Sequence, residues 1–130
     1  MAKLSDKARS ILQKKTFAHL ATIMPDGSPH VSAVWVDVDG DLVVVNTARG
    51  RVKDENMKRN KHVSLSATDP ENPYSSITLR GTVAEITTEG ADAHIDAMAK
   101  KYLGQDKYPF RKPGEERVIY RIAVEKQSSM

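Results

Sequence analysis

Residues 42–56 have the sequence LVVVNTARGRVKDEN. The run Leu42-Val43-Val44-Val45 is the most apolar in the chain and predicts a strand buried on both faces. Asn46, Thr47 and Gly50 then break the strand, and the residues after Gly50 can wind a helix. The stretch therefore predicts a buried strand that is followed directly by the N-terminus of a helix.

Positive charge is concentrated just after this strand. Residues 49–61 contain six Lys or Arg against two acidic residues, a local net charge of +4, whereas the whole chain has a formal net charge of +3. Free backbone N–H groups at a helix N-terminus favour an anion, and arginine offers a planar fork that suits phosphate oxygens. Arg49, Arg51 and Lys53 recur at every second residue, a spacing that turns them to one side of an extended segment. The hypothesis is a phosphate or phosphodiester clamp made by Arg51 and Lys53.

A plainer interpretation of the same run is a solvated helix face, which is what most charge runs are. This interpretation stays open for three residues further along the helix, Lys58, Arg59 and Lys61. For Arg51 and Lys53 we favour the clamp, because a Thr and a Gly precede them at the end of a strand.

Length and composition limit the classes of function. A chain of 130 residues can bury a core of its own, and the absence of cysteine excludes thiol chemistry, zinc–cysteine sites and a disulfide scaffold. No apolar run approaches the ~20 residues that span a bilayer, and the N-terminus has no signal-like apolar region, so we expect a cytoplasmic protein without a membrane span. A modest positive charge gathered in one patch favours a small anionic ligand over nucleic acid.

The first half of the chain predicts a helix and three strands. Ser5 is the expected N-cap of an amphipathic helix that runs to about Lys14 and buries Leu4, Ala8, Ile11 and Leu12. Turn signals at Pro25-Asp26-Gly27-Ser28 and Asp39-Gly40-Asp41 separate three strands, expected at residues 17–24, 29–38 and 42–47. These strands are expected to form a three-stranded antiparallel meander.

The second half predicts three more strands and two helices. A helix-competent segment covers residues 51–60, and Thr88 is the expected cap of a helix that buries Ala91, Ile95, Met98, Ala99 and Tyr102. Strands are expected at residues 62–67, 75–86 and 117–125, with Gly81 at a bulge, loops at 69–73 and 103–113, and a frayed end at 127–130. We therefore expect one domain, residues 1–130, built as a mainly β, six-stranded antiparallel barrel braced by helices.

Catalysis by side chains has little support in the sequence. There is no GxSxG, no HExxH and no Walker lysine. The histidines lack metal-ligand spacing, so ordinary strand or helix histidines are the favoured interpretation of His19, His30, His62 and His94. Among these, His30 has the best claim to a further role because it follows a turn on the second strand. Trp35 is expected to pack in the core or at an interface, and the reaction chemistry is expected from a bound cofactor.

Two segments carry a resemblance to a known family. They are Leu20-Ala21-Thr22-Ile23-Met24-Pro25-Asp26-Gly27-Ser28-Pro29-His30-Val31-Ser32 and Asn46-Thr47-Ala48-Arg49-Gly50-Arg51-Val52-Lys53-Asp54-Glu55-Asn56. The chain resembles the pyridoxamine 5′-phosphate oxidase-like split β-barrel proteins, in particular the flavin/deazaflavin oxidoreductases of group B that use coenzyme F420. The likeness runs from the first helix to the last strand.

The resemblance implies a homodimer with two cofactor sites at the subunit interface. It matches Arg51 and Lys53 to the family's phosphate-binding pair, with Asn46 and Thr47 at the preceding strand end. It also matches three residues to the strand that lines the tricyclic ring, His30, Val31 and Ser32. The chain lacks the extended C-terminal segment of the true pyridoxamine phosphate oxidases, which argues against vitamin B6 oxidation.

The expected function is a coenzyme F420-dependent reductase that transfers a hydride to an electron-poor small-molecule acceptor. Two alternatives stay open: the same fold carrying FMN, and a carrier that binds the cofactor without turnover. The charges at Lys58, Arg59 and Lys61 favour the longer polyanionic tail of the deazaflavin. No catalytic residue is identified, and the proton can come from solvent, His30 or Tyr74.

Overall fold

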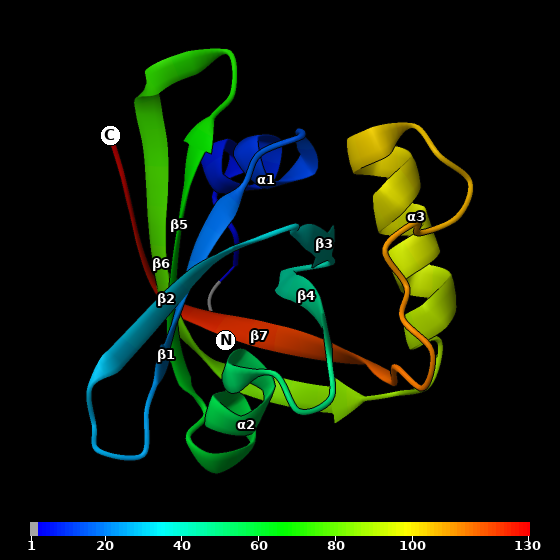
Figure 1. Ribbon diagram of the computed structural model, residues 1–130. Coiled ribbons are helices and arrows are strands. Elements are labelled where there is room, and N and C mark those ends of the chain that lie inside the picture. The colour runs from blue at the N-terminus through cyan, green and yellow to red at the C-terminus, as the bar shows by residue number, and fades with distance from the viewer. Residues whose placement is uncertain (1–2) are drawn as a thin grey trace.

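One antiparallel sheet of seven strands forms the body of the molecule in the computed structural model, which describes residues 3–130 (Figure 1). Met1 and Ala2, the start of the expected domain, lie outside the described residues. The helices are α1 (Asp6–Gln13), α2 (Val52–Arg59) and α3 (Ala91–Leu103). The strands are β1 (Ala18–Ile23), β2 (Pro29–Val34), β3 (Asp37–Asp39), β4 (Leu42–Ala48), β5 (His62–Asp69), β6 (Asn72–Thr87) and β7 (Arg117–Ser129).

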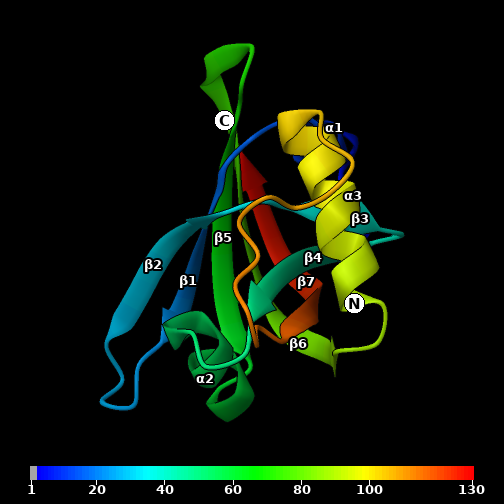
Figure 2. The same ribbon diagram turned by 45° about the vertical axis from the view of Figure 1, so that its right-hand side comes forward.

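The sheet order is β2-β1-β5-β6-β7-β4-β3, with every neighbouring pair antiparallel. Its two edge strands, β2 and β3, are separated in sequence by only Trp35 and Val36, so the sheet must curl to bring its edges together. Figures 1 and 2 show α1 and α2 toward opposite ends of the sheet and α3 along the side of β3 and β4. The expected mainly β fold is confirmed, with seven strands in the described chain instead of six.

The expected strand 29–38 is broken in the middle, and the predicted three-stranded meander is wrong. β2 pairs with β1, whereas β3 pairs with β4 at the other edge of the sheet. The break occurs because Val36, which is fully buried, bonds to α3 instead of to a strand. Its N–H donates to the Tyr102 hydroxyl at 3.0 Å, and its carbonyl accepts from Lys101 Nζ at 2.7 Å. The predicted tight turn into β4 is confirmed, with Gly40 at φ 62°.

β4 is buried on both faces, as its apolar run predicts. Val43 and Val45 face the main core inside the curled sheet. Val44 faces the opposite side, where it packs with Ile119 of β7 and Ala91 of α3. β4 is therefore packed against other residues on both faces. The basic residues follow directly after its last residue, Ala48.

The ends of several elements differ from the prediction. The Ser5 cap is confirmed, since its Oγ accepts from the Ala8 N–H at 3.1 Å, but α3 is preceded by Gly90 at φ 76° instead of being capped by Thr88. The expected loop at 69–73 is a two-residue turn, because β6 already begins at Asn72. The chain end does not fray as predicted, because β7 continues to Ser129 and residues 127–129 pair with 77–79 of β6.

No helix within residues 3–130 is long and apolar enough to cross a membrane.

Gly81 of β6 lies in close contact with the backbone of Ala123 and Val124 in β7, and this contact gives a stability prediction. The register shifts between Arg80 and Gly81, which confirms the predicted irregularity, and a Cβ added at Gly81 would lie 2.1 Å from the Ala123 carbonyl oxygen. Gly81→Ala must push the two strands apart, so its free energy of unfolding is expected to fall by at least about 2 kcal/mol in urea denaturation. Ala84→Val, at an exposed position of the same strand, is the control and should stay within about 0.5 kcal/mol. Equal stability of the two variants would rule out the close approach.

Candidate functional site

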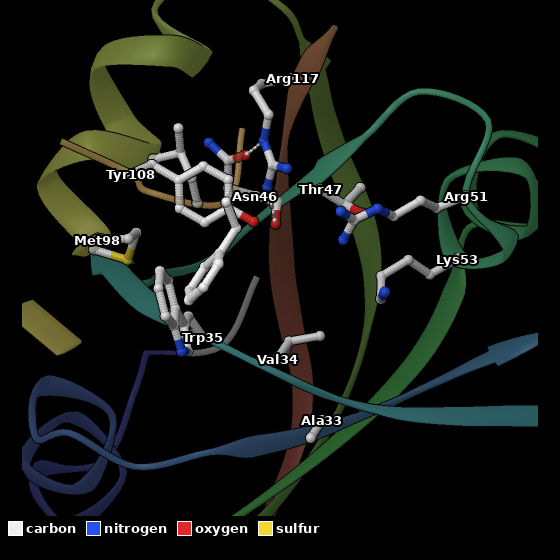
Figure 3. Close-up of a pocket in the computed structure, with 12 residues that line it drawn as sticks. Ala33, Val34, Trp35, Asn46, Thr47, Arg51, Lys53, Met98, Tyr108 and Arg117 are labelled. Atoms are coloured by element: carbon white, nitrogen blue, oxygen red, sulfur yellow. Dashed lines mark hydrogen bonds between the residues drawn. The ribbon is translucent and has the colours of Figure 1, made fainter. Parts of the chain in front are cut away.

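A pocket of about 160 Å³ opens between the end of β4, the start of α2 and helix α3 (Figure 3). One end of the pocket is polar and cationic, lined by Asn46, Thr47, Arg51, Lys53 and Arg117. The other end is apolar and aromatic, lined by Trp35, Ile95, Met98, Tyr108 and Phe110, and Ala33 and Val34 of β2 complete the wall. The pocket thus combines a site for negative charge with a site for a flat apolar group.

The junction of β4 and α2 brings the predicted clamp residues together. Arg51 is the N-cap residue of α2 and Lys53 lies in its first turn, and both line the cationic end of the pocket. Arg49 does not join them, because its Nη1 bonds to Asp54 Oδ1 at 3.1 Å. The every-second-residue spacing fails here since the helix begins at Val52 and the segment is no longer extended.

Arg117 is a further cation of the pocket that the sequence pattern does not identify. It is the first residue of β7, is only 4% exposed, and pairs with Ala48 at the end of β4. Its Nε donates to Asn46 Oδ1 at 2.9 Å, and its Nη1 lies 3.3 Å from Glu115 Oε1. Burial lowers the pKa of this guanidinium below its usual range, although arginine still keeps its charge.

The cationic end carries more positive than negative charge. The buried carboxylate of Glu115 is shared between Arg117 and Arg51, whose Nη2 lies 3.5 Å away. Lys53 forms no ion pair with any of residues 3–130. Burial lowers the pKa of Lys53, and the nearby charges of Arg51 and Arg117 lower it further. A bound anion would relieve this repulsion.

Three buried polar atoms at this end have no hydrogen-bond partner in the described part of the chain: Thr47 Oγ1, Glu115 Oε2, and Arg117 Nη1, which has only its ion pair with Glu115. A buried polar group without a partner costs on the order of 1–3 kcal/mol. Thr47 Oγ1 and Arg117 Nη1 can donate, and their residues line the pocket together with Lys53 and Arg51. This donor set fits the oxygens of a phosphate group.

A family model for pyridoxamine 5′-phosphate oxidase matches residues 4–130, nearly the whole chain. The chain belongs to the pyridoxamine 5′-phosphate oxidase-like family. No curated protein matches it.

Solved structures agree with this family membership. An F420 reductase is 31% identical and has a TM-score of 0.83, and the match covers 96% of this chain and 98% of that one. The conserved hypothetical protein Rv2991 of Mycobacterium tuberculosis is 23% identical, with a TM-score of 0.76 over 97% of this chain and 84% of that one. HupZ of Group A Streptococcus is 21% identical, with a TM-score of 0.69 over 98% and 94% of the two chains. The last two likenesses show the fold alone.

The aromatic wall is already assembled in this member of the pyridoxamine 5′-phosphate oxidase-like family. Trp35 stacks on Tyr102 with ring centroids 5.0 Å apart, and the edge of Tyr108 meets Trp35 at 6.0 Å. The Tyr102 hydroxyl donates to the Thr16 carbonyl at 2.7 Å, and Tyr108 also lies 5.1 Å under the Arg117 guanidinium. Trp35 is half-buried and does not belong to the core cluster, so the predicted core packing is not found; it forms part of the pocket wall, and an interface role stays a prediction.

The three strand residues matched by resemblance lie next to the pocket but outside its lining. His30, Val31 and Ser32 belong to β2, the strand that contributes Ala33 and Val34 to the wall. Val31 is 63% exposed, while His30 Nδ1 and Ser32 Oγ are buried and without a partner in the described chain. Contact of these residues with a cofactor ring stays a prediction.

Proposed function

We propose that this chain is a coenzyme F420-dependent oxidoreductase that transfers a hydride from the reduced deazaflavin to an electron-poor small molecule. Family membership and the likeness to an F420 reductase support an oxidoreductase. The observation that carries the proposal is the cationic end of the pocket, directly beside an aromatic wall. Within residues 3–130, Thr47 Oγ1 and Arg117 Nη1 have no hydrogen-bond partner there, although Arg117 Nη1 is ion-paired with Glu115. A phosphorylated, ring-bearing cofactor matches both halves of that pocket.

The residues of the pocket have separable roles in this proposal. Lys53, Arg51 and Arg117 bind the phosphate through charge-assisted hydrogen bonds, and Thr47 donates a further one. The wall built on Trp35 excludes water and orients the ring, which lowers the entropic cost of reaching the reactive geometry. When bound, the reduced deazaflavin supplies the hydride. Neither His30 nor Tyr74 lines the pocket, so the proposal takes solvent as the proton source.

The choice between the deazaflavin and FMN depends less on the distal basic residues than the sequence indicates. Lys58 Nζ pairs with Glu55 Oε1 at 3.1 Å, and Arg59 Nη2 donates to the Ile23 carbonyl at 3.0 Å. These bonds favour the plainer interpretation, a helix face that interacts within its own chain. The preference for coenzyme F420 is supported mainly by the likeness to the F420 reductase.

A turnover experiment separates the enzyme from a carrier. Reduced coenzyme F420 is mixed anaerobically with a panel of quinones, activated alkenes and nitroaromatics, with and without the protein, and reoxidation is followed by absorbance. The proposal predicts that the protein accelerates reoxidation by at least one acceptor class, and that Lys53→Ala lowers the acceleration at limiting cofactor. A protein that binds the cofactor but accelerates none of these reactions would be the carrier.

The proposal includes a homodimer, and this can be measured. A pocket of about 160 Å³ is smaller than the roughly 300–1,000 Å³ of typical ligand sites, so a second chain is expected to complete it. Exposed apolar side chains suited to such an interface include Phe17, Val31, Val52, Tyr74 and Phe110. Light scattering at micromolar concentration should give twice the chain mass of 14.4 kDa. A monomer under these conditions would contradict the dimer.

A further inference from the structure

A chain of polar side chains leads from strand β3 to the cationic end of the pocket. Asp37 Oδ2 lies 3.2 Å from His94 Nε2, and His94 Nδ1 lies 3.1 Å from Asn46 Nδ2. Asn46 Oδ1 then accepts from Arg117 Nε at 2.9 Å, the contact drawn as a dashed line in Figure 3. The chain joins β3, α3, β4 and β7, and it ends on the guanidinium that faces the pocket.

The direction of every hydrogen bond in this chain is determined. The Ala91 carbonyl, which can only accept, bonds to Asn46 Nδ2 at 2.9 Å, while Arg117 Nε can only donate. The amide of Asn46 therefore has a single allowed orientation, with its second N–H pointing at His94 Nδ1. That nitrogen must accept, so the imidazole proton is on Nε2 and is donated to Asp37. This hydrogen bond lowers the pKa of Asp37.

We propose that Asp37 and His94 are positioning residues which, through the amide of Asn46, hold Arg117 in place for an anion, and that they do so only while His94 is neutral. That the anion is the cofactor phosphate rests on the proposed function. Neither residue touches the pocket, and the isolated histidines gave no sign of such a role in the sequence.

Protonation of His94 would break the chain. A proton on Nδ1 would face the N–H of Asn46, and the amide can avoid this only by turning over, which costs its bonds to Ala91 and to Arg117 Nε. The charged groups that contacts place at this site are Asp37 of β3, Arg117 of β7 and Lys101 of α3 itself. β4 contributes the neutral Asn46.

The first test needs no cofactor. Nitrogen-15 NMR of His94 in its neutral form should show the Nε2–H tautomer, and the Arg117 Nε–H should then give a sharp, slowly exchanging signal that broadens when the ring is protonated. In His94→Asn, the side-chain oxygen can replace Nδ1 as acceptor but cannot be protonated, so the Arg117 signal should persist to lower pH. In His94→Leu the signal should broaden at every pH. An Nδ1–H tautomer, or an Arg117 signal that is unchanged in His94→Leu, would overturn the proposal.

The second test links the chain to binding. Coenzyme F420 affinity should fall about fivefold to tenfold in His94→Leu, which corresponds to the net worth of one ordinary hydrogen bond, and should be largely restored in His94→Asn. If the NMR results hold but the affinities of the two variants agree, the positioning is real and has no role in binding. If neither variant nor wild type binds coenzyme F420, the proposed function fails and the NMR results still stand.

Discussion

Lys53→Ala is expected to weaken cofactor binding by about tenfold to a hundredfold. Lys53 is partly buried, makes no ion pair with the described residues, and lies beside two other cations, so its charge is available to a phosphate. A charge-assisted bond of on the order of 1.5–3 kcal/mol accounts for this range. The measurement is an equilibrium titration of coenzyme F420 into each variant, with the fold checked by circular dichroism. The Arg51 side chain is 44% exposed and already shares Glu115, so Arg51→Ala is expected to cost less than Lys53→Ala.

Lys58→Ala is the matched control on the same helix. Lys58 is paired with Glu55 on the solvated face, so its loss should cost no more than about 1 kcal/mol of binding. Added salt should also reduce the effect of Lys58→Ala more than that of Lys53→Ala, since screening acts most strongly on exposed charges. Equal losses for Lys53→Ala and Lys58→Ala would replace the clamp by a general electrostatic patch.

Asp54→Ala is expected to lower the free energy of unfolding by about 3–5 kcal/mol, as removal of one member of a buried charged network does. Asp54 is fully buried, and its Oδ1 accepts from the Tyr120 hydroxyl at 2.5 Å and from Arg49 Nη1 at 3.1 Å. Its Oδ2 accepts from the Gly50 N–H at 2.9 Å. Burial, and then the bond to Asp54, raise the pKa of Tyr120, which therefore stays a donor. Urea denaturation measures the loss.

Glu55→Ala is the control for Asp54→Ala. Glu55 is the next residue of the same helix, but its side chain is 53% exposed and contacts only Lys58 in the described salt bridges, so its loss should stay within about 1 kcal/mol. Because Asp54 fixes the segment before Arg51, Asp54→Ala should also weaken cofactor binding at temperatures where the protein is still folded. Stability close to that of Glu55→Ala would show that the buried network contributes little.

Local sequence patterns predicted the parts of the fold that depend on neighbouring residues. The apolar run of β4, the turn with Gly40, the Ser5 cap and the irregularity at Gly81 all follow from residue types within a few positions. The end of β2 at Val34 was not predicted, because it depends on hydrogen bonds that join the backbone of Val36 to Lys101 and Tyr102, which lie far away in the sequence. The alternating pattern of a strand does not show whether its backbone groups bond to another strand or to the side chains of a helix.

The residues of the candidate site likewise fall into those that local sequence patterns predicted and those that they did not. Asn46, Thr47, Arg51 and Lys53 lie within eight residues of one another, and the strand-to-helix junction places all of them at one pocket. Arg117 joins them only through the pairing of β4 with β7, across 71 residues from Asn46, and His94 reaches Asn46 across 48. Contacts between residues so far apart in the sequence cannot be predicted from local patterns in a single sequence.

The most direct test of the central claim is a pair of equilibrium titrations that follow the fluorescence of Trp35. This is the only tryptophan in the chain, and it lines the pocket, so a bound ring should change its emission. The account predicts saturable binding of coenzyme F420 with a lower Kd than that of FMN measured in the same buffer. Tighter binding of FMN would contradict it.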